Sequence, residues 1–470
     1  MKKIMAAILM SLIILISLPM MASSAEPESE FVAEGRIRSS SRLSEYNGVS
    51  AFPYQGFDFK YYIHIEDGAN IRDEQVALYE GYCQHYRMQV VMLEDDELIS
   101  FWGIPTIKAD HYKILPDRLQ LLSRQELGDS NTRFMDAVKL QSGKVLVSWH
   151  EYVIYEYVIG EEMSPVDIGF AYRRTDGTWE TLPYARVENH SGIPNTQGVL
   201  CQHPADNSVW SFTSSDGNKW VHAIHLSDKK DEISVDWVDS RFTDKSDGDM
   251  TREGEFPFLV AIPDPIRNSI LLAYQTCDYK FFSIQPFVKG AKICIIEVSK
   301  TGGKELFFLH DKWTERLSSF ALGLFPSGEF WMAYYPIDPE TLSYQDLYLM
   351  RSSNPTEEIL LGQVSIQMGQ LNRQPLVDSS YHLLFNLSDG IYSYWVDEKP
   401  PLPTITVFMG RATYELNGSA EQSVAVVVYA TTEAEAIDNI TEYIMVEFPG
   451  AANIQFSYEI ITANTFKILE

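Results

Sequence analysis

The chain has 470 residues, of which 45% are apolar and 13% aromatic, and its formal net charge is −28. A chain of this length and composition buries a core, which excludes a disordered protein and favours one large domain with a smaller one. The excess of Asp and Glu excludes a nucleic-acid-binding protein, because clustered Lys and Arg are needed to neutralise phosphates.

The N-terminal segment has the layout of a secretory signal. Lys2 and Lys3 precede an apolar run from Ile4 to Met21, and small residues follow as far as Ala25. This order predicts a signal peptide over 1–25 with cleavage after Ala25, and an uncleaved anchor is the alternative. No later apolar stretch is long enough to span a bilayer. We therefore expect a secreted or extracytoplasmic protein, at the cell surface or in the periplasm, with no membrane span after cleavage.

One pattern recurs six times in the body of the chain. A short apolar strand is followed by a polar turn and by a second strand that ends in an aromatic residue, which is the signal of a β-hairpin. The copies end at Trp102, Trp149, Phe212, Tyr274, Tyr334 and Phe385, at intervals of 47, 63, 62, 60 and 51 residues. Further strand-like segments follow most copies, which makes about four strands per copy and is typical of a propeller blade.

The repeat predicts an all-β fold, a β-propeller of about six four-stranded blades over residues 31–398. The last copy is short, and strands within 31–70 are expected to complete its sheet and close the ring, which removes an exposed edge. A β-sandwich or a β-solenoid is the alternative. The near-equal intervals favour radial repetition.

Turn sequences add a family resemblance. The segment 214–220 reads SSDGNKW, and shorter versions, TDGTW and SDG, lie at 175–179 and 388–390. These turns resemble the Asp-box of BNR/sialidase-like β-propellers, although the first is one residue shorter than the family pattern and lacks its second glycine. In such a turn the Asp accepts backbone N–H groups, the Gly takes positive φ and the Trp packs between strands. The resemblance therefore implies the fold more than an activity.

Four arginines stand at or beside the first strand of a copy: Arg87, Arg133, Arg316 and Arg373. Equivalent positions in successive blades converge on one face around the propeller axis. Converged arginines bind carboxylates, so we expect a site for a ligand on the central face, a glycan, a cell-envelope component or an anionic small molecule. Salt bridges from these arginines to acidic loops are the alternative. The oligomeric state does not follow from the sequence.

The resemblance implies an enzymatic alternative, a sialidase-like glycoside hydrolase. Such enzymes combine an arginine cluster with an Asp acid/base and a Tyr nucleophile supported by a Glu. The candidates here are Asp136, Tyr334 and Glu151, with Tyr335 and Glu253 as alternates. The family's Arg-Ile-Pro motif is absent, and fold does not fix function. Binding without catalysis is therefore the preferred interpretation, and a protein-interaction scaffold at the cell surface is the third.

Carboxylates gather in the segment 239–249, where Asp244, Asp247 and Asp249 lie around a glycine. Oxygen ligands on a loop suit calcium, the one cofactor that the sequence indicates. A solvated acidic loop is the alternative.

Four cysteines, at 83, 201, 277 and 294, allow three pairings in an exported chain. Cys277 and Cys294 are close enough in sequence to face each other on adjacent strands. Buried thiols without a disulfide are the alternative for Cys83 and Cys201.

The chain ends in a separate module. Three prolines make a stiff linker over 399–403, and a small β-rich domain is expected over 404–470. We expect two strands around a turn in 405–418, a buried strand over 423–432, a short helix over 433–437 and a closing hairpin from 453. Gly410 to Tyr414, Asn417-Gly418 and 448–451 resemble the copper amine oxidase N-terminal-like domain, a stalk module, which implies attachment or spacing.

Overall fold

The computed structural model describes most of the chain between residues 29 and 462. The described residues are 29–37, 42–67, 70–76, 88–94, 96–102, 106–128, 132–151, 166–187, 195–215, 221–230, 232–245, 259–280, 287–299, 302–309, 320–334, 346–362, 376–378, 382–387, 389–396, 406–416, 422–430 and 433–462. The chain divides into two compact units, Met1–Asp397 and Glu398–Glu470.

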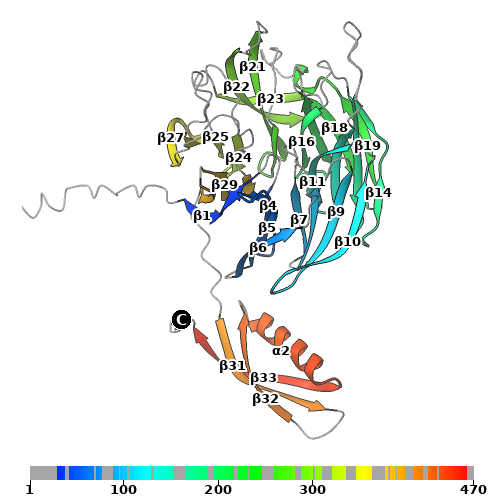
Figure 1. The fold of residues 1–470 in the computed structure, drawn as a ribbon, viewed down its shortest axis with the longest axis vertical. Coiled ribbons are helices and arrows are strands. Elements are labelled where there is room, and N and C mark those ends of the chain that lie inside the picture. The colour runs from blue at the N-terminus through cyan, green and yellow to red at the C-terminus, as the bar shows by residue number, and fades with distance from the viewer. Residues whose placement is uncertain are drawn as a thin grey trace, which may run out of the picture. The chain divides into compact units, whose positions relative to one another are not determined.

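The first unit consists of antiparallel sheets that follow one another along the chain (Figure 1). The first sheet contains β2 (Gly35–Arg36), β3 (Ser44–Tyr46), β4 (Val49–Gly56), β5 (Tyr61–Asp67) and β6 (Asn70–Val76). The second contains β7 (Gln89–Glu94), β8 (Glu97–Trp102), β9 (Ile107–Ile114) and β10 (Leu119–Leu127). The third contains β11 (Thr132–Lys139), β12 (Val145–Glu151), β13 (Val166–Arg173), β14 (Trp179–Thr181) and β15 (Ala185–Val187).

The remaining sheets of this unit repeat the arrangement. The fourth contains β16 (Asn195–Gln202), β17 (Val209–Ser215), β18 (His222–Asp228) and β19 (Ile233–Asp239), and the short 3-10 helix η1 (Phe242–Lys245) follows it. The fifth contains β20 (Leu259–Asp264), β21 (Ser269–Lys280), β22 (Phe287–Ser299) and β23 (Gly302–Leu309). The sixth contains β24 (Phe320–Leu324), β25 (Phe330–Tyr334), β26 (Leu347–Arg351) and β27 (Asn354–Gly362). The seventh contains β28 (Leu376–Asp378), β29 (His382–Asn386), β30 (Ile391–Trp395) and β1 (Glu30–Ala33).

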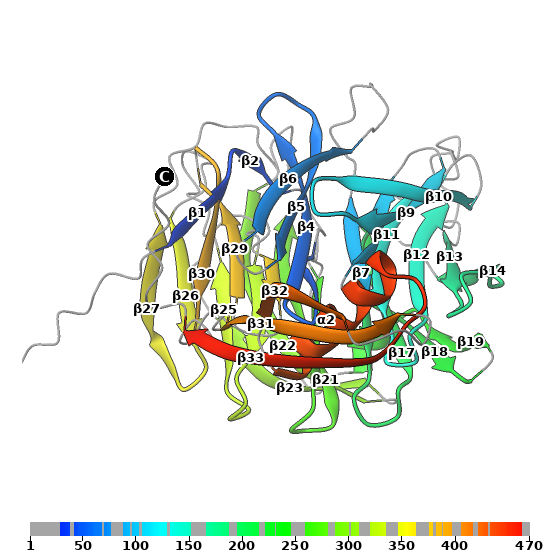
Figure 2. The same ribbon diagram turned by 90° about the horizontal axis from the view of Figure 1, so that it is seen from below.

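The sheets are arranged radially. Their first strands contact one another in chain order, from β3 to β7, β11, β16, β20, β24 and β28. Figure 2 shows the sheets following one another around a centre, from β27 and β1 through β6 and β10 to β19 and β23. Apolar clusters fill the space between neighbours; Leu271 of the fifth sheet and Phe320 of the sixth, for example, share one cluster. This is a β-propeller, as the sequence predicted.

The described residues of the first unit form seven sheets, where the sequence predicted a propeller of about six blades. β1 alone joins the last sheet, where Phe31 lies opposite Tyr392, and this pairing closes the ring as expected. The strands between Gly35 and Val76 form a sheet of their own. The repeat did not reveal this sheet because its inner strand is split into β2 and β3, and because β4 ends at Gly56 rather than at an aromatic residue.

Three glycine-containing hairpins of the propeller share one loop geometry. In each, the N–H of the first residue donates to the carbonyl of the fifth, and the N–H of the fourth donates to the carbonyl of the first. The loops are Leu140–Lys144, Arg174–Thr178 and Phe325–Glu329. Their fourth residues are Gly143, Gly177 and Gly328, with φ of 82°, 91° and 84°. Glycine suits this position because a Cβ at positive φ meets the following carbonyl oxygen.

The turn 175–179 shows the chemistry expected of an Asp turn. Oδ1 of Asp176 accepts the backbone N–H of Thr178 at 2.9 Å and its hydroxyl at 2.7 Å. The ring of Trp179 meets Phe101 of the neighbouring sheet edge to face, with 6.0 Å between centroids. The other two turns of this kind lie partly outside the described residues.

Two fully buried tryptophans pack directly on glycines of adjacent strands. Trp149 on β12 covers Gly169 on β13, and Trp331 on β25 covers Gly323 on β24. A Cβ on either glycine would overlap the indole ring. The aromatic positions of the repeat are thus core positions. Each of these two tryptophans fits only because the neighbouring residue is a glycine, which has no side chain.

The second unit is a three-stranded sheet with one helix. β31 (Thr406–Leu416) lies between β32 (Gln422–Ala430) and β33 (Ala451–Thr462). The helix α2 (Glu433–Glu447) buries Ala436, Ile440 and Ile444, which recur every four residues and so form one apolar stripe. Because the stripe continues as far as Ile444, α2 extends well beyond the short helix predicted over 433–437.

One further prediction for the second unit was wrong. Residues 406–416 form one strand where two strands around a turn were predicted, and Gly410 lies inside that strand. β33 pairs with β31 from Ala451 to Thr462 with one irregularity. The rest of the segment for which a hairpin was predicted lies outside the described residues.

Within the described parts of both units, no helix is long and apolar enough to cross a membrane.

Candidate functional site

The structure describes the side chains of two of the predicted site residues, Asp136 and Tyr334. The others lie outside the residues or side chains that it describes: Arg87, Arg133, Arg316, Arg373, Glu151, Asp244, Asp247 and Asp249, with the alternates Tyr335 and Glu253. The backbone places Arg133 near the start of β11, Glu151 at the end of β12 and Asp244 in η1.

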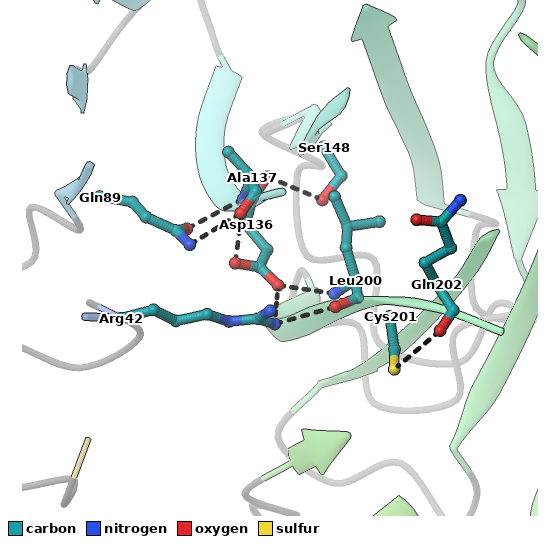
Figure 3. A network of polar contacts seen from close by, with 8 residues as sticks. All are labelled: Arg42, Gln89, Asp136, Ala137, Ser148, Leu200, Cys201 and Gln202. Atoms are coloured by element: carbon teal, nitrogen blue, oxygen red, sulfur yellow. Dashed lines mark hydrogen bonds and ion pairs between the residues drawn. The ribbon is translucent and has the colours of Figure 1, made fainter. Parts of the chain in front are cut away.

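Asp136 lies on β11, the first strand of its sheet, and its side chain is buried. Oδ2 accepts the backbone N–H of Leu200 on β16 at 2.6 Å and forms an ion pair with Nη2 of Arg42 (Figure 3). Oδ1 accepts the N–H of Ala137 at 2.9 Å. Burial raises the pKa of this carboxyl, whereas Arg42 and the backbone N–H groups favour its charged form. The carboxylate therefore bridges two neighbouring sheets with both oxygens engaged.

The same kind of bridge occurs at two other junctions between sheets. The amide of Gln89 donates to the carbonyl of Ala137 at 2.7 Å and accepts its N–H at 2.9 Å. The amide of Asn386 donates to the carbonyl of Ile37 at 3.0 Å and accepts its N–H at 2.9 Å. One side chain thus satisfies both backbone groups of a residue on the next sheet, which lowers the cost of burying them.

At the third junction two side chains share this task. Asp136 accepts the N–H of Leu200, and Nη2 of Arg42 donates to the Leu200 carbonyl at 3.0 Å. Figure 3 shows the two side chains meeting at β16, with Gln89 beside them. A single neutral amide would be enough to satisfy both backbone groups of Leu200. The charged pair of Asp136 and Arg42 satisfies them as well, and it also places a guanidinium at this junction.

Arg42 comes from the segment between β2 and β3, and its guanidinium reaches first strands of the third and fourth sheets. Its side chain is 31% exposed. Among the described residues, the N–H groups on Nε and Nη1 have no hydrogen-bond partner. The geometry therefore gives an anchored, part-exposed guanidinium at the inner strands of the propeller.

Sequence reasoning missed Arg42 because residues 31–70 were assigned to the last sheet. One signal was available: Arg42 stands just before the inner strand β3, as Arg133 stands near the start of β11.

Tyr334 lies elsewhere in the propeller. It is fully buried on β25, in the apolar cluster between the fifth and sixth sheets, and its hydroxyl donates to Oε1 of Glu358 on the outer strand β27. Burial and the neighbouring Glu358 carboxylate raise the pKa of the phenol. The structure thus places Asp136 on the inner strand of the third sheet and Tyr334 on the second strand of the sixth.

The thiols differ from the expected arrangement. Cys201 and Cys294 are buried and form no disulfide, and Cys294 lies opposite Tyr274 in the pairing of β21 with β22. The expectation that Cys277 and Cys294 face each other was wrong, because Cys277 falls at a register shift further along β21. Burial raises the pKa of Cys201 to about 12, so this thiol is unreactive.

No group of three or more His, Cys, Asp or Glu side chains within the described part of the chain could hold a metal ion. The segment proposed for calcium lies mostly outside that part.

A buried charged histidine lies in the first sheet. His64 on β5 is 1% exposed, with Nδ1 2.8 Å from Oδ1 of Asp73 and Nε2 3.2 Å from Oε1 of Glu66. Burial alone lowers the pKa of this imidazole, but hydrogen bonds and charges from the two carboxylates outweigh it and raise the pKa to about 9. The folded protein thus holds an imidazolium between two acids.

This pair of contacts predicts a loss of stability at alkaline pH. An unfolded histidine titrates near pH 6.5, so the contribution of His64 is fully present below that pH and is lost as the pH rises through about 9. We expect the free energy of unfolding to fall by roughly 2–3 kcal/mol over this range, a figure reduced for the solvent exposure of the two acids. Urea unfolding at a series of pH values, for the wild type and His64→Gln, measures the difference. Parallel profiles for the two proteins would contradict the prediction.

Comparison with known proteins finds no matching protein-family model, and no curated protein matches the chain. Similar solved structures include an oligogalacturonate lyase in complex with manganese, at 11% identity over 79% of this chain and 90% of that one, with a TM-score of 0.44. They also include the hemagglutinin-neuraminidase of Parainfluenza Virus 5, at 9% identity over 71% and 90%, with a TM-score of 0.37. AofleA from Arthrobotrys oligospora is similar at 8% identity over 79% and 91%, with a TM-score of 0.39. Similarity at this level says nothing about activity.

Proposed function

We propose that this chain is an exported β-propeller that binds a carboxylate-bearing ligand, a glycan or a cell-envelope component, on its central face without transforming it. The observation that supports the proposal is the Arg42 guanidinium, which reaches the inner strands of two other sheets and keeps donors on Nε and Nη1. Planar arginine donors match a carboxylate, and the match is strongest where the guanidinium is held in place.

Asp136 is a positioning residue in this proposal. Its carboxylate and the Leu200 carbonyl both accept hydrogen bonds from Nη2 of Arg42. The orientation of the guanidinium is therefore set before a ligand arrives. Preorganised donors lose less conformational freedom on binding. Arg87, Arg133, Arg316 and Arg373 remain proposed partners for the same ligand from neighbouring blades.

Binding is preferred over hydrolysis because the two described catalytic candidates are already engaged. Both oxygens of Asp136 accept hydrogen bonds from within the protein, and the Tyr334 hydroxyl donates to Glu358 from a buried position. A sialidase-like mechanism needs the acid and the nucleophile at one sugar. The proposal therefore assigns no catalytic step to them.

The test is an array of sialylated, uronate-containing and neutral glycans, followed by calorimetry on the best glycan. We expect acidic glycans to be preferred, and Arg42→Lys to weaken binding at least tenfold with little change in Tm, because the lysine keeps the charge beside Asp136. Arg118→Lys is the matched control, since this exposed arginine pairs only with the exposed Asp117 among the described residues.

Three outcomes would overturn the proposal. Equal binding by the wild type and Arg42→Lys removes the role of the guanidinium. Binding of no glycan favours an interaction scaffold instead. Turnover of a fluorogenic sialoside that is lost in Arg373→Ala establishes the sialidase-like alternative.

A further inference from the structure

The loop between β4 and β5 has the geometry shared by the three glycine-containing hairpins. The N–H of Gly56 donates to the carbonyl of Lys60 at 2.9 Å, and the N–H of Phe59 donates to the carbonyl of Gly56 at 3.0 Å. The fourth position of this loop, which is glycine in the other three, is Phe59.

Phe59 adopts a backbone conformation that, among the other described residues, only glycines and asparagines adopt. Its φ is 66°, and the remaining non-glycine residues with positive φ in the described regions are all asparagines: Asn47, Asn207, Asn268 and Asn453. Asparagine tolerates the left-handed region, whereas a bulky side chain there is strained. Glycine or asparagine would serve the fold better at this position. An outlier of this kind points to a use outside the fold.

The ring of Phe59 has no packing role that would explain it. Its residue is 80% exposed, and that of Phe57 in the same loop is 41% exposed. Neither ring joins an apolar core cluster within the described chain, but the guanidinium carbon of Arg36 lies 5.4 Å from the centre of the Phe57 ring. Two aromatic rings therefore project from the propeller beside a cation.

Hydrogen bonds hold the backbone of the loop that carries these rings. Asp58 accepts the N–H of Lys60 at 3.0 Å and the hydroxyl of Tyr62 at 2.8 Å, and Nε2 of Gln55 donates to the Phe59 carbonyl at 3.2 Å. The hydrogen bond from Lys60 is the main reason that the pKa of Asp58 is lowered, so its carboxylate is charged at neutral pH. The backbone from which the rings extend is thus held beside a charged carboxylate.

We propose that Phe57 and Phe59 form a stacking platform for a sugar ring of a glycan, separate from the arginine on the propeller axis. A pyranose presents polarised C–H groups on one face, which suit the negative face of an aromatic ring. Its hydroxyls lie at the edge, within reach of donors and acceptors such as Asp58, Lys60 and Arg36. A hairpin tip offers no groove to an apolar peptide, and a net charge of −28 opposes an anionic bilayer.

The strain at Phe59 provides a test that separates function from folding. Phe59→Gly and Phe59→Asn should each weaken binding to the best neutral glycan of the array at least tenfold, while Tm stays the same or rises by about 2 °C. Phe59→Tyr should keep the binding, because it keeps the ring. Leu121→Ala, which removes an exposed apolar side chain from β10, is the matched control and should change neither quantity.

Results of two kinds would overturn this proposal. Unchanged glycan binding in Phe59→Gly excludes the platform. Binding of the wild type, but not of Phe59→Gly, to phosphatidylcholine vesicles without any bound glycan assigns the loop to a membrane surface. Arg42→Lys should leave binding at the platform unchanged, so failure of the axial site and failure of the platform are distinguished.

Discussion

Arg42→Ala is expected to lower the free energy of unfolding by about 3–5 kcal/mol, because it leaves Asp136 as a buried carboxylate without its cation. The Leu200 carbonyl loses its donor in the same variant. Urea unfolding at pH 7 measures the change.

A double-mutant cycle separates the ion pair from the packing around it. In Arg42→Ala combined with Asp136→Ala, no unpaired charge remains, so the double variant should lose much less than the sum of the two single losses. Arg42→Lys should lie close to the wild type. Additive losses, or a loss below about 1 kcal/mol in Arg42→Ala, would show that the pair does not join the two sheets energetically.

Gly169→Ala is expected to lower the free energy of unfolding by about 3 kcal/mol, because the added methyl group overlaps the fully buried ring of Trp149. An indole enclosed by core residues cannot move aside without displacing neighbours on two sheets. Thermal and urea unfolding of the purified variant test this.

The matched control is Gly198→Ala. There a Cβ would also be too close to its neighbour, but that neighbour is Cε of Met135, the end of a flexible side chain. The loss should be below about 1 kcal/mol. Trp149→Phe makes room at the other site, so Gly169→Ala should cost less in that background. Equal losses for the two glycines would refute the role given to the rigid ring.

The repeat in the sequence predicted the propeller because it reports a local property. A strand, a turn and an aromatic end are fixed by neighbouring residues, and Trp149 and Tyr334 take the core positions that this pattern implies. The sheet from Gly35 to Val76 escaped detection because its inner strand is interrupted, so the local pattern is absent although the packing is the same.

The candidate site depends on contacts that no local pattern reveals. Asp136 was predicted as a functional residue from its position, but its partners Arg42 and Leu200 lie 94 and 64 residues away in the sequence. The strain at Phe59 was hidden for a different reason, since a backbone angle is not visible in a sequence. Comparison of the four equivalent loops reveals the strain, because this loop has phenylalanine at the position where the other three have glycine.

The pairing of β1 with β30 links the order of synthesis to the order of folding. Glu30 lies opposite Ser393, so the last sheet is complete only after almost the whole first unit has been made. Closure over so long a loop is slow compared with hairpin formation. β1 also begins a few residues after the predicted cleavage position at Ala25. The first strand to be synthesised is thus the one that closes the ring, after every other sheet of the first unit has been made.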